Sequence, residues 1–153
     1  MRRHEKEIAS FAEIEQILRQ EKVCRLALSH HDEPYLVPLS YGYADRTLYF
    51  HSAAEGKKIA ILRANPRLCF EVERQIEVVG APLPCNWGMR FETVVGTGQA
   101  EFIEDEAEKK AALGIIMAHY GAGDTDDLPP EACRKVAVFR VRIESVSGKR
   151  SGF

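Results

Sequence analysis

The clearest hydrophobic pattern in the chain is a strict alternation between residues 136 and 146. Apolar and charged side chains alternate there. The apolar residues are Ala137, Phe139, Val141 and Ile143, and the charged residues are Arg140, Arg142 and Glu144. A period of two is that of a β-strand with one face in the core and the other in solvent. We therefore predict a half-buried strand from Val136 to Val146.

Five further apolar stretches predict five more strands, because each is bounded by polar or Gly/Pro-containing turns. These strands are expected at Val23–Ser29, Tyr35–Tyr43, Thr47–His51, Arg67–Val78 and Arg90–Ile103. Most of the connections are short, which favours antiparallel neighbours. Residues 80–88 contain too much Pro and Gly for regular structure. Gly96 and Gly98 lie inside a predicted strand, where glycine more often marks a bulge or a barrel corner than a ligand site.

Three helices are expected outside these strands. The first follows a capping box formed by Ser10 and Glu13, the second runs from about Glu55 to Ala64, and the third follows a cap at Asp105 and ends at Gly121. Residues 1–9 are polar and are expected to be loose, and residues 121–130 are expected to form a loop.

The expected fold class is therefore mainly β with flanking helices, in the form of a six-stranded antiparallel barrel. Strict alternation of strands and helices is absent, so a doubly wound parallel sheet is disfavoured. A length of 153 residues suits one domain covering residues 1–153. No repeat or linker interrupts it.

Composition excludes several classes of function. The net charge of −2 gives no electrostatic support for binding nucleic acid. No apolar run is long enough to span a membrane, and no apolar signal core follows the basic N-terminus, so a cytoplasmic location is expected. The four cysteines form no CxxC pair and the histidines form no HExxH motif, so we expect neither a metal site nor a disulfide framework.

The most informative candidate site is the segment HSAAEGKK, residues 51–58. Lys57 and Lys58 fall where a helix should begin, although the free N–H groups of a first turn already carry partial positive charge. This arrangement is typical of an anion site, and His51 and Ser52 at the end of the preceding strand could donate to the same ligand. The alternative is a surface helix with solvated lysines. The segment is not a P-loop, because that motif needs Gly at position 51 and Ser or Thr at position 58.

Pro38 lies in the middle of a predicted strand, and proline cannot donate to a β-ladder. The strand is therefore either an ordinary edge strand or one that faces a ligand. In the second case the backbone from Leu39 to Tyr41 could pair with a planar polar ring such as a flavin. The two alternatives are equally supported by this feature.

Several segments together resemble a known family, and they occur in its order along nearly the whole chain. They are MRRHEKEI, CRLAL, PYLVPLSYGY, LYFHSAAEGKK, the Asn-Pro stop and VVGTGQAEFI. The chain is similar to the pyridoxamine 5′-phosphate oxidase-like split barrels, and most similar to the branch that contains the nitroimidazole-resistance (Nim) proteins.

The resemblance implies a split β-barrel that forms a homodimer with FMN at the subunit interface. It places the strand Val37, Pro38, Leu39, Ser40 and Tyr41 along the flavin, with His51 and Ser52 beside it. It gives Lys57 and Lys58 to the phosphate, and it brings Trp87, Arg90 and Thr93 towards the flavin or the dimer seam. His51 matches the position of a functional histidine in the Nim-like proteins.

The resulting expectation is an FMN-dependent oxidoreductase that reduces small molecules such as nitro compounds. The alternatives are a non-catalytic flavin- or haem-binding module, acting as a sensor or carrier, and pyridoxamine phosphate oxidase activity. The last is disfavoured because the C-terminal segment that binds the B6 substrate in true oxidases has no match in GKRSGF. The sequence does not identify the substrate or the electron donor.

Overall fold

The structure is a computed structural model that describes residues 4–122 and 128–153. Its eight strands are β1 (Glu7–Ile8), β2 (Val23–His30), β3 (Glu33–Ser40), β4 (Gly42–Ala44), β5 (Thr47–Ala53), β6 (Arg67–Val79), β7 (Gly88–Phe102) and β8 (Val136–Ser151). Its helices are α1 (Phe11–Gln20), α2 (Lys57–Ala64), α3 (Glu106–His119) and α4 (Pro130–Arg134), with short 3-10 turns η1 (His4–Lys6) and η2 (Pro84–Asn86). The prediction of a mainly β fold with flanking helices is confirmed.

All eight strands belong to one antiparallel sheet. The order is β3-β2-β6-β7-β8-β5-β4, and β1 pairs with β8. The first and last strands of this path, β3 and β4, follow each other in sequence and are separated only by Tyr41. The chain therefore passes directly from one end of the sheet path to the other.

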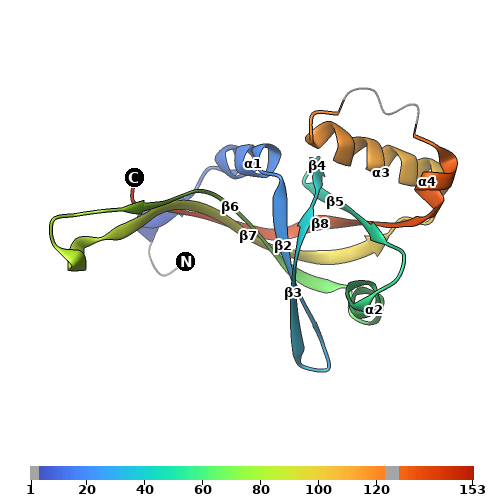
Figure 1. The fold of residues 1–153 in the computed structure, drawn as a ribbon, viewed down its shortest axis with the longest axis horizontal. Helices are drawn as coiled ribbons and strands as arrows, with labels where there is room; N and C mark the ends of the chain where they lie inside the picture. Colours follow the sequence, from blue (N-terminus) through green and yellow to red (C-terminus); the bar gives the residue numbers. More distant parts are fainter. Residues whose placement is uncertain (1–3, 123–127) are drawn as a thin grey trace.

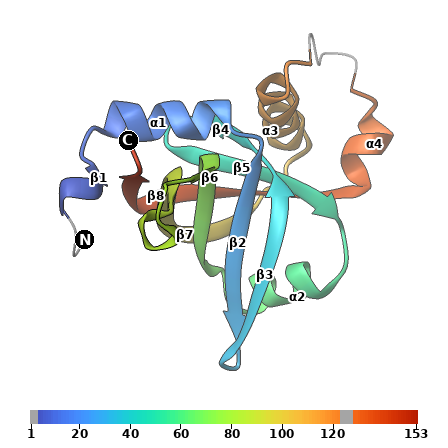
Figure 2. The same cartoon turned by 60° about the vertical axis from the view of Figure 1, so that its left-hand side comes forward.

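The helices cover different parts of the sheet (Figure 1). α1 and α3 lie on one side, and α2 lies on the other, near the β2–β3 hairpin; Figure 2 shows the same arrangement from another direction. The main core lies between the sheet and α1, around Phe50, Phe70 and Phe139, which are fully buried. A second cluster, around Ile103, Ile116 and Cys133, joins α3 and α4 to the sheet.

The alternation of β8 is confirmed, because its predicted apolar residues are buried and Arg142 and Glu144 are exposed. The glycines of β7 also behave as expected, with an irregularity in register between Thr97 and Gly98. At Gly96 a Cβ would lie 2.4 Å from Cζ of Phe70. Only glycine lets this strand pass so close to the aromatic core.

Several predicted elements need correction. The strand expected from Tyr35 to Tyr43 is two strands, because the chain changes its pairing partner at Tyr41, and the sheet consequently has more than six strands. Glu7 and Ile8, expected to be loose, pair with β8. Ser10 makes no side-chain cap. Residues 123–127 of the predicted loop lie outside the described residues, and α4 occupies the region that follows.

Candidate functional site: the β5–α2 junction

The predicted anion site lies where β5 passes into α2. Gly56 is the N-cap of α2 and has φ 129° and ψ 170°, a region that side-chain-bearing residues rarely adopt. No side chain caps this helix, and its first turn contains no acidic residue. The first-turn N–H groups are therefore available to a ligand.

Lys57 and Lys58 open this helix and occupy different environments. The Lys57 ammonium is exposed and lies 5.1 Å from the centroid of the Tyr35 ring in β3, which orients it by a cation–π contact. Lys58 is partly buried, and this burial lowers the pKa of its ammonium. Desolvation of a cation is unfavourable unless a counter-charge is close, so a bound anion would stabilise Lys58 in its charged form.

His51 contributes an unsatisfied polar atom to the same junction. Its Nδ1 is buried and has no hydrogen-bond partner among the described residues. Burial, and then the charge of Lys58, lower the pKa of His51, which keeps the imidazole neutral near pH 7. A buried nitrogen without a partner costs free energy, and a ligand that bonds to it would recover that cost.

Ser52 is already engaged in a local contact. Its hydroxyl donates to the carbonyl oxygen of Ala53 at 2.9 Å. The hydroxyl oxygen keeps its acceptor lone pairs, so Ser52 can accept from a ligand without breaking this bond. The role expected from the sequence was donation, which would require the hydroxyl to rotate.

β3 is an edge strand, as Pro38 suggested. Val37 and Leu39 pack against the core, whereas Pro38 and Ser40 are exposed on the other face. Only the second pair can present side chains to a ligand on the outer face of the sheet. Tyr41 is fully buried within one chain, so neither its side chain nor its backbone is exposed to a ligand there.

Trp87, Arg90 and Thr93 lie apart from the junction within one chain. The outer parts of β6 and β7, residues 75–91, form an arm that projects at the opposite end of the molecule from α2 (Figure 1). Trp87 is 58% exposed and donates from Nε1 to Ala81 O at 2.8 Å. Arg90 contacts Glu77 and the carbonyl of Gly152, and Thr93 donates to Glu71. The structure thus brings together His51, Lys57 and Lys58 but not these three residues.

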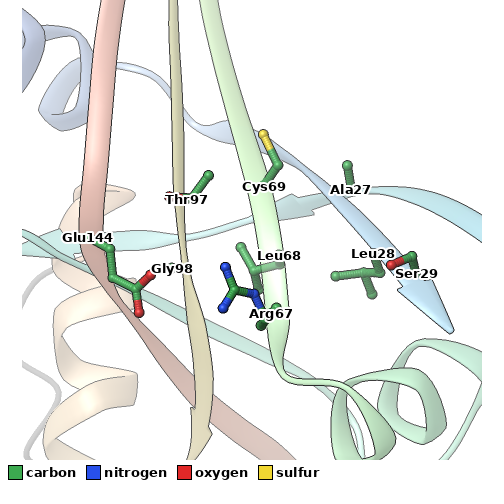
Figure 3. A pocket seen from close by; sticks show the side chains of 9 residues that line it. All are labelled: Ala27, Leu28, Ser29, Arg67, Leu68, Cys69, Thr97, Gly98 and Glu144. Atoms are coloured by element: carbon green, nitrogen blue, oxygen red, sulfur yellow. The ribbon is translucent and has the colours of Figure 1, made fainter.

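A shallow hollow on the outer face of the sheet was missed by the sequence analysis (Figure 3). It has a volume of about 370 Å³, and its lining residues are Ala27, Leu28, Ser29, Arg67, Leu68, Cys69, Thr97, Gly98 and Glu144. Small outward-facing residues on neighbouring strands, Ala27, Cys69 and Thr97, are aligned by the register across β2, β6 and β7. These residues are far apart in sequence, so no local motif could reveal the hollow. Cys69 is half-buried on this face.

The part of the chain that the structure describes contains no group of three or more His, Cys, Asp or Glu side chains that could hold a metal ion. Within that part, no helix has the length and apolar character needed to cross a membrane. The four cysteines are free thiols.

Comparison with known proteins identifies the family. The family described as pyridoxamine 5′-phosphate oxidase matches residues 10–150. The chain therefore belongs to the pyridoxamine 5′-phosphate oxidase family.

Two solved structures are similar in both sequence and fold. One, from Bacteroides thetaiotaomicron, is provisionally assigned as a 5-nitroimidazole antibiotic resistance protein; it is 36% identical, has a TM-score of 0.83, and the match covers 94% of this chain and 86% of that one. The other is an FAD-binding protein of Mesorhizobium loti, 31% identical with a TM-score of 0.70, covering 94% and 96% of the two chains. The resemblance to the Nim branch is confirmed by the first structure.

A third structure, the FAD and haem binding protein of Mycobacterium smegmatis, shares the fold with a TM-score of 0.87 over 97% of this chain and 74% of that one, at 18% identity. A curated relative, an uncharacterised protein of Rhizobium meliloti (strain 1021), is 31% identical over 65 residues, which are 42% of this chain and 42% of that protein.

Proposed function

We propose that this chain is an FMN-binding split-barrel flavoprotein that acts as an oxidoreductase on small molecules such as nitro compounds. The observation that carries the proposal is the β5–α2 junction. There an uncapped helix N-terminus, two lysines and a buried imidazole nitrogen without a partner meet at one place. This donor set fits a terminal phosphate that adjoins a polar ring system.

The residues of the junction have distinct roles in this proposal. The first-turn N–H groups of α2, with Lys57 and Lys58, hold the phosphate, and Tyr35 steadies the Lys57 ammonium. The outward face of β3, at Pro38 and Ser40, supports the flavin. When bound, the flavin supplies the electron transfer, and the protein supplies orientation and electrostatics. Neutral His51 orients a polar group of the substrate or moves a proton to it.

FMN is proposed in preference to FAD because the junction offers its cations to a single terminal phosphate. The Mesorhizobium loti relative is described as FAD-binding, so FAD is the cofactor against which the proposal must be tested. Measuring the affinities of riboflavin, FMN and FAD for the same apoprotein shows which flavin the site prefers. Tighter binding of FAD than of FMN would contradict the choice of cofactor while leaving the flavin site in place.

The test of the phosphate site is a double substitution, Lys57→Ala with Lys58→Ala. Each charge-assisted contact to phosphate is worth roughly 1.5–3 kcal/mol, so FMN should bind at least about tenfold more weakly to the variant. Riboflavin, which lacks the phosphate, should bind almost as before. Lys110→Ala, on the surface of α3, serves as the matched charge control. Equal losses for FMN and riboflavin would show that the lysines do not contact phosphate.

We also propose a homodimer with the flavin at its interface. Two observations support it: the arm, residues 75–91, projects away from α2 within one chain (Figure 1), and it exposes the apolar side chains of Ile76, Val78, Leu83 and Met89. A second subunit would cover this apolar surface and bring its arm towards the first subunit's flavin. Sedimentation at micromolar concentration should give a dimer. A monomer that still binds FMN with full affinity would contradict the interface location.

A further inference from the structure

A second pocket is lined by cations from three different helices. Arg63 belongs to α2, Lys109 to α3 and Arg134 to α4, and all three line a cavity of about 200 Å³. Ala54, in the loop between β5 and α2, also lines it. The pocket is distinct from the junction of Lys57 and Lys58, because Arg63 is in the last turn of α2 and the two lysines are in its first turn.

Part of the lining of this pocket is apolar. Phe102, Ile103, Val136 and Val138 line it, and Ile103 and Val138 are almost completely buried. The guanidinium carbon of Arg63 lies 4.3 Å from the centroid of the Phe102 ring. This stacking holds the Arg63 side chain against the pocket instead of leaving it free in solvent.

The cations of the pocket are poorly neutralised. Arg63 lies 3.6 Å from Glu104, and Arg134 lies 3.7 Å from Glu106, with all four side chains more than half exposed. Exposed pairs at such distances contribute little free energy and are easily exchanged for another anion. Lys109 is half-buried and makes no ion pair among the described residues. The lining therefore has three cations and one carboxylate, Glu104.

We propose that this pocket binds a small organic carboxylate with a compact apolar body, such as an aromatic or branched-chain acid. Guanidinium groups bind carboxylates in a bidentate manner, which gives the anionic end its partners in Arg63 and Arg134. The apolar body lies against Phe102 and Val136, the half-buried apolar residues of the lining. A cavity of about 200 Å³ is below the usual size range of sites for larger ligands, which limits the ligand to a few carbons or one ring.

The test uses the full-length protein and benzoate as the probe, with benzamide as a neutral ligand of the same shape. Titrations are followed by the methyl NMR signals of Ile103, Val136 and Val138. The expected result is saturable benzoate binding, at least tenfold tighter than benzamide binding, with shifts at these three methyl-bearing residues. This comparison needs no variant and is independent of flavin binding.

A double variant, Arg63→Gln with Arg134→Gln, should weaken benzoate binding at least tenfold. Arg142→Gln is the control, because Arg142 is a 70% exposed arginine in β8 that does not line this pocket. Thermal unfolding of each variant verifies that the fold is retained. Absence of saturable shifts, or equal affinity for benzoate and benzamide, would overturn the proposal. Displacement of benzoate by FAD but not by FMN would also overturn it, because the pocket would then hold the nucleotide part of a flavin.

Discussion

The hydroxyl of Tyr41 donates a hydrogen bond to the main-chain oxygen of Leu18 at 2.8 Å. This bond joins the single residue between β3 and β4 to the last turns of α1. The Tyr41 ring also packs against His119 of α3, with centroids 4.8 Å apart. The point where the chain passes between the two ends of the sheet path is therefore held by two helices.

Replacing Tyr41 by Phe should test the first of these contacts. The ring is kept, but the buried carbonyl of Leu18 loses a donor, so the free energy of unfolding should fall by about 1–2 kcal/mol. Denaturant unfolding of Tyr41→Phe measures the change. Tyr49→Phe, at a half-buried tyrosine for which no hydroxyl bond is found among the described residues, is the control and should change little. Similar losses of unfolding free energy in both variants would show that the hydrogen bond to Leu18 does not account for the effect of Tyr41→Phe.

The close approach at Gly96 gives a second prediction. Gly96→Ala should lower the free energy of unfolding by about 1–3 kcal/mol, because the new methyl group would overlap the Phe70 ring and Ser145 O, 2.6 Å away. Gly88→Ala lies in the same strand, and a Cβ there meets no atom within 4 Å. Chemical denaturation of the two variants should therefore separate them. If Gly96→Ala left the free energy of unfolding unchanged, β7 would be able to move away from the core without loss of stability.

Sequence patterns predicted the parts of this fold that depend on local periodicity. The alternation in β8 and the Asp105 cap, which accepts from Glu108 N at 2.9 Å, could be recognised without tertiary information. The division at Tyr41 could not, because apolar alternation continues through it and the change is in the pairing partner. The expected capping box does not form: Ser10 makes no side-chain cap, and the carboxylate of Glu13 pairs with Arg150, which is distant in sequence. In α4, Pro130 occupies the first helical turn, a position that proline suits, although the surrounding composition resembled a loop.

The candidate site also has parts that the local sequence predicts and parts that depend on tertiary structure. His51, Lys57 and Lys58 lie within eight residues, so their meeting at the β5–α2 junction could be predicted from the sequence. The outer hollow and the cation pocket depend on the register of distant strands and the packing of three helices. Neither has a sequence motif. The flavin contacts expected of Trp87, Arg90 and Thr93 stay predictions, since these three residues lie apart from the β5–α2 junction within one chain.

A buried ion network at the base of the arm gives a third prediction. Glu92 is 4% exposed and accepts from Arg74 Nε at 2.5 Å, and Arg150 approaches its other oxygen at 3.2 Å. Glu92→Gln would remove the counter-charge of Arg74 and one of the two carboxylates beside Arg150, which keeps its pair with Glu13. The expected loss is about 3 kcal/mol in the free energy of unfolding.

The control for this network is Glu101→Gln, which weakens an exposed pair with Arg140 and should cost less than about 1 kcal/mol. Thermal or denaturant unfolding of both variants provides the comparison. Equal effects would mean that solvent reaches Glu92 easily. In that case proteases should cleave the arm of the Glu92→Gln variant at the wild-type rate.

The pKa of His51 gives a fourth prediction, for the flavin-free protein. Burial and Lys58 place this pKa below its ordinary value of about 6.5, so the fold favours the neutral imidazole. The contribution of this lowered pKa to the free energy of unfolding is complete above about pH 6.5. It is lost as the pH falls through the folded-state pKa. His119, whose pKa is also lowered by burial, adds to the same loss.

NMR titration of the histidine ring protons measures the two groups separately. Addition of FMN should raise the pKa of His51, because a phosphate close to the ring stabilises imidazolium, and should leave His119 nearly unchanged. Riboflavin should produce a smaller rise than FMN. A His51 pKa at or above 6.5 without flavin, or one insensitive to FMN, would place the ring outside the proposed phosphate site.

The last prediction concerns the chemical role of His51. If the imidazole orients the substrate or transfers a proton, His51→Ala should keep the fold and most of the bound flavin. Reoxidation of the reduced flavin by a nitroaromatic acceptor should then slow by on the order of 100-fold, the lower range for general acid–base contributions. Stopped-flow absorbance, normalised to the bound flavin, measures this rate. His30→Ala, at the end of β2 just before the β2–β3 turn, is the control and should react at the wild-type rate.

The structural alternative predicts a different combination of results. If His51 only supports the turn into α2, His51→Ala would lose stability and flavin together, and the remaining flavoprotein would react at the normal rate. His51→Gln sharpens the comparison, because the amide can occupy the buried position of Nδ1 but cannot act as an acid near neutral pH. Restored stability and flavin content without restored rate would assign His51 to catalysis. A normal rate in both variants would leave it as a structural residue of the β5–α2 junction.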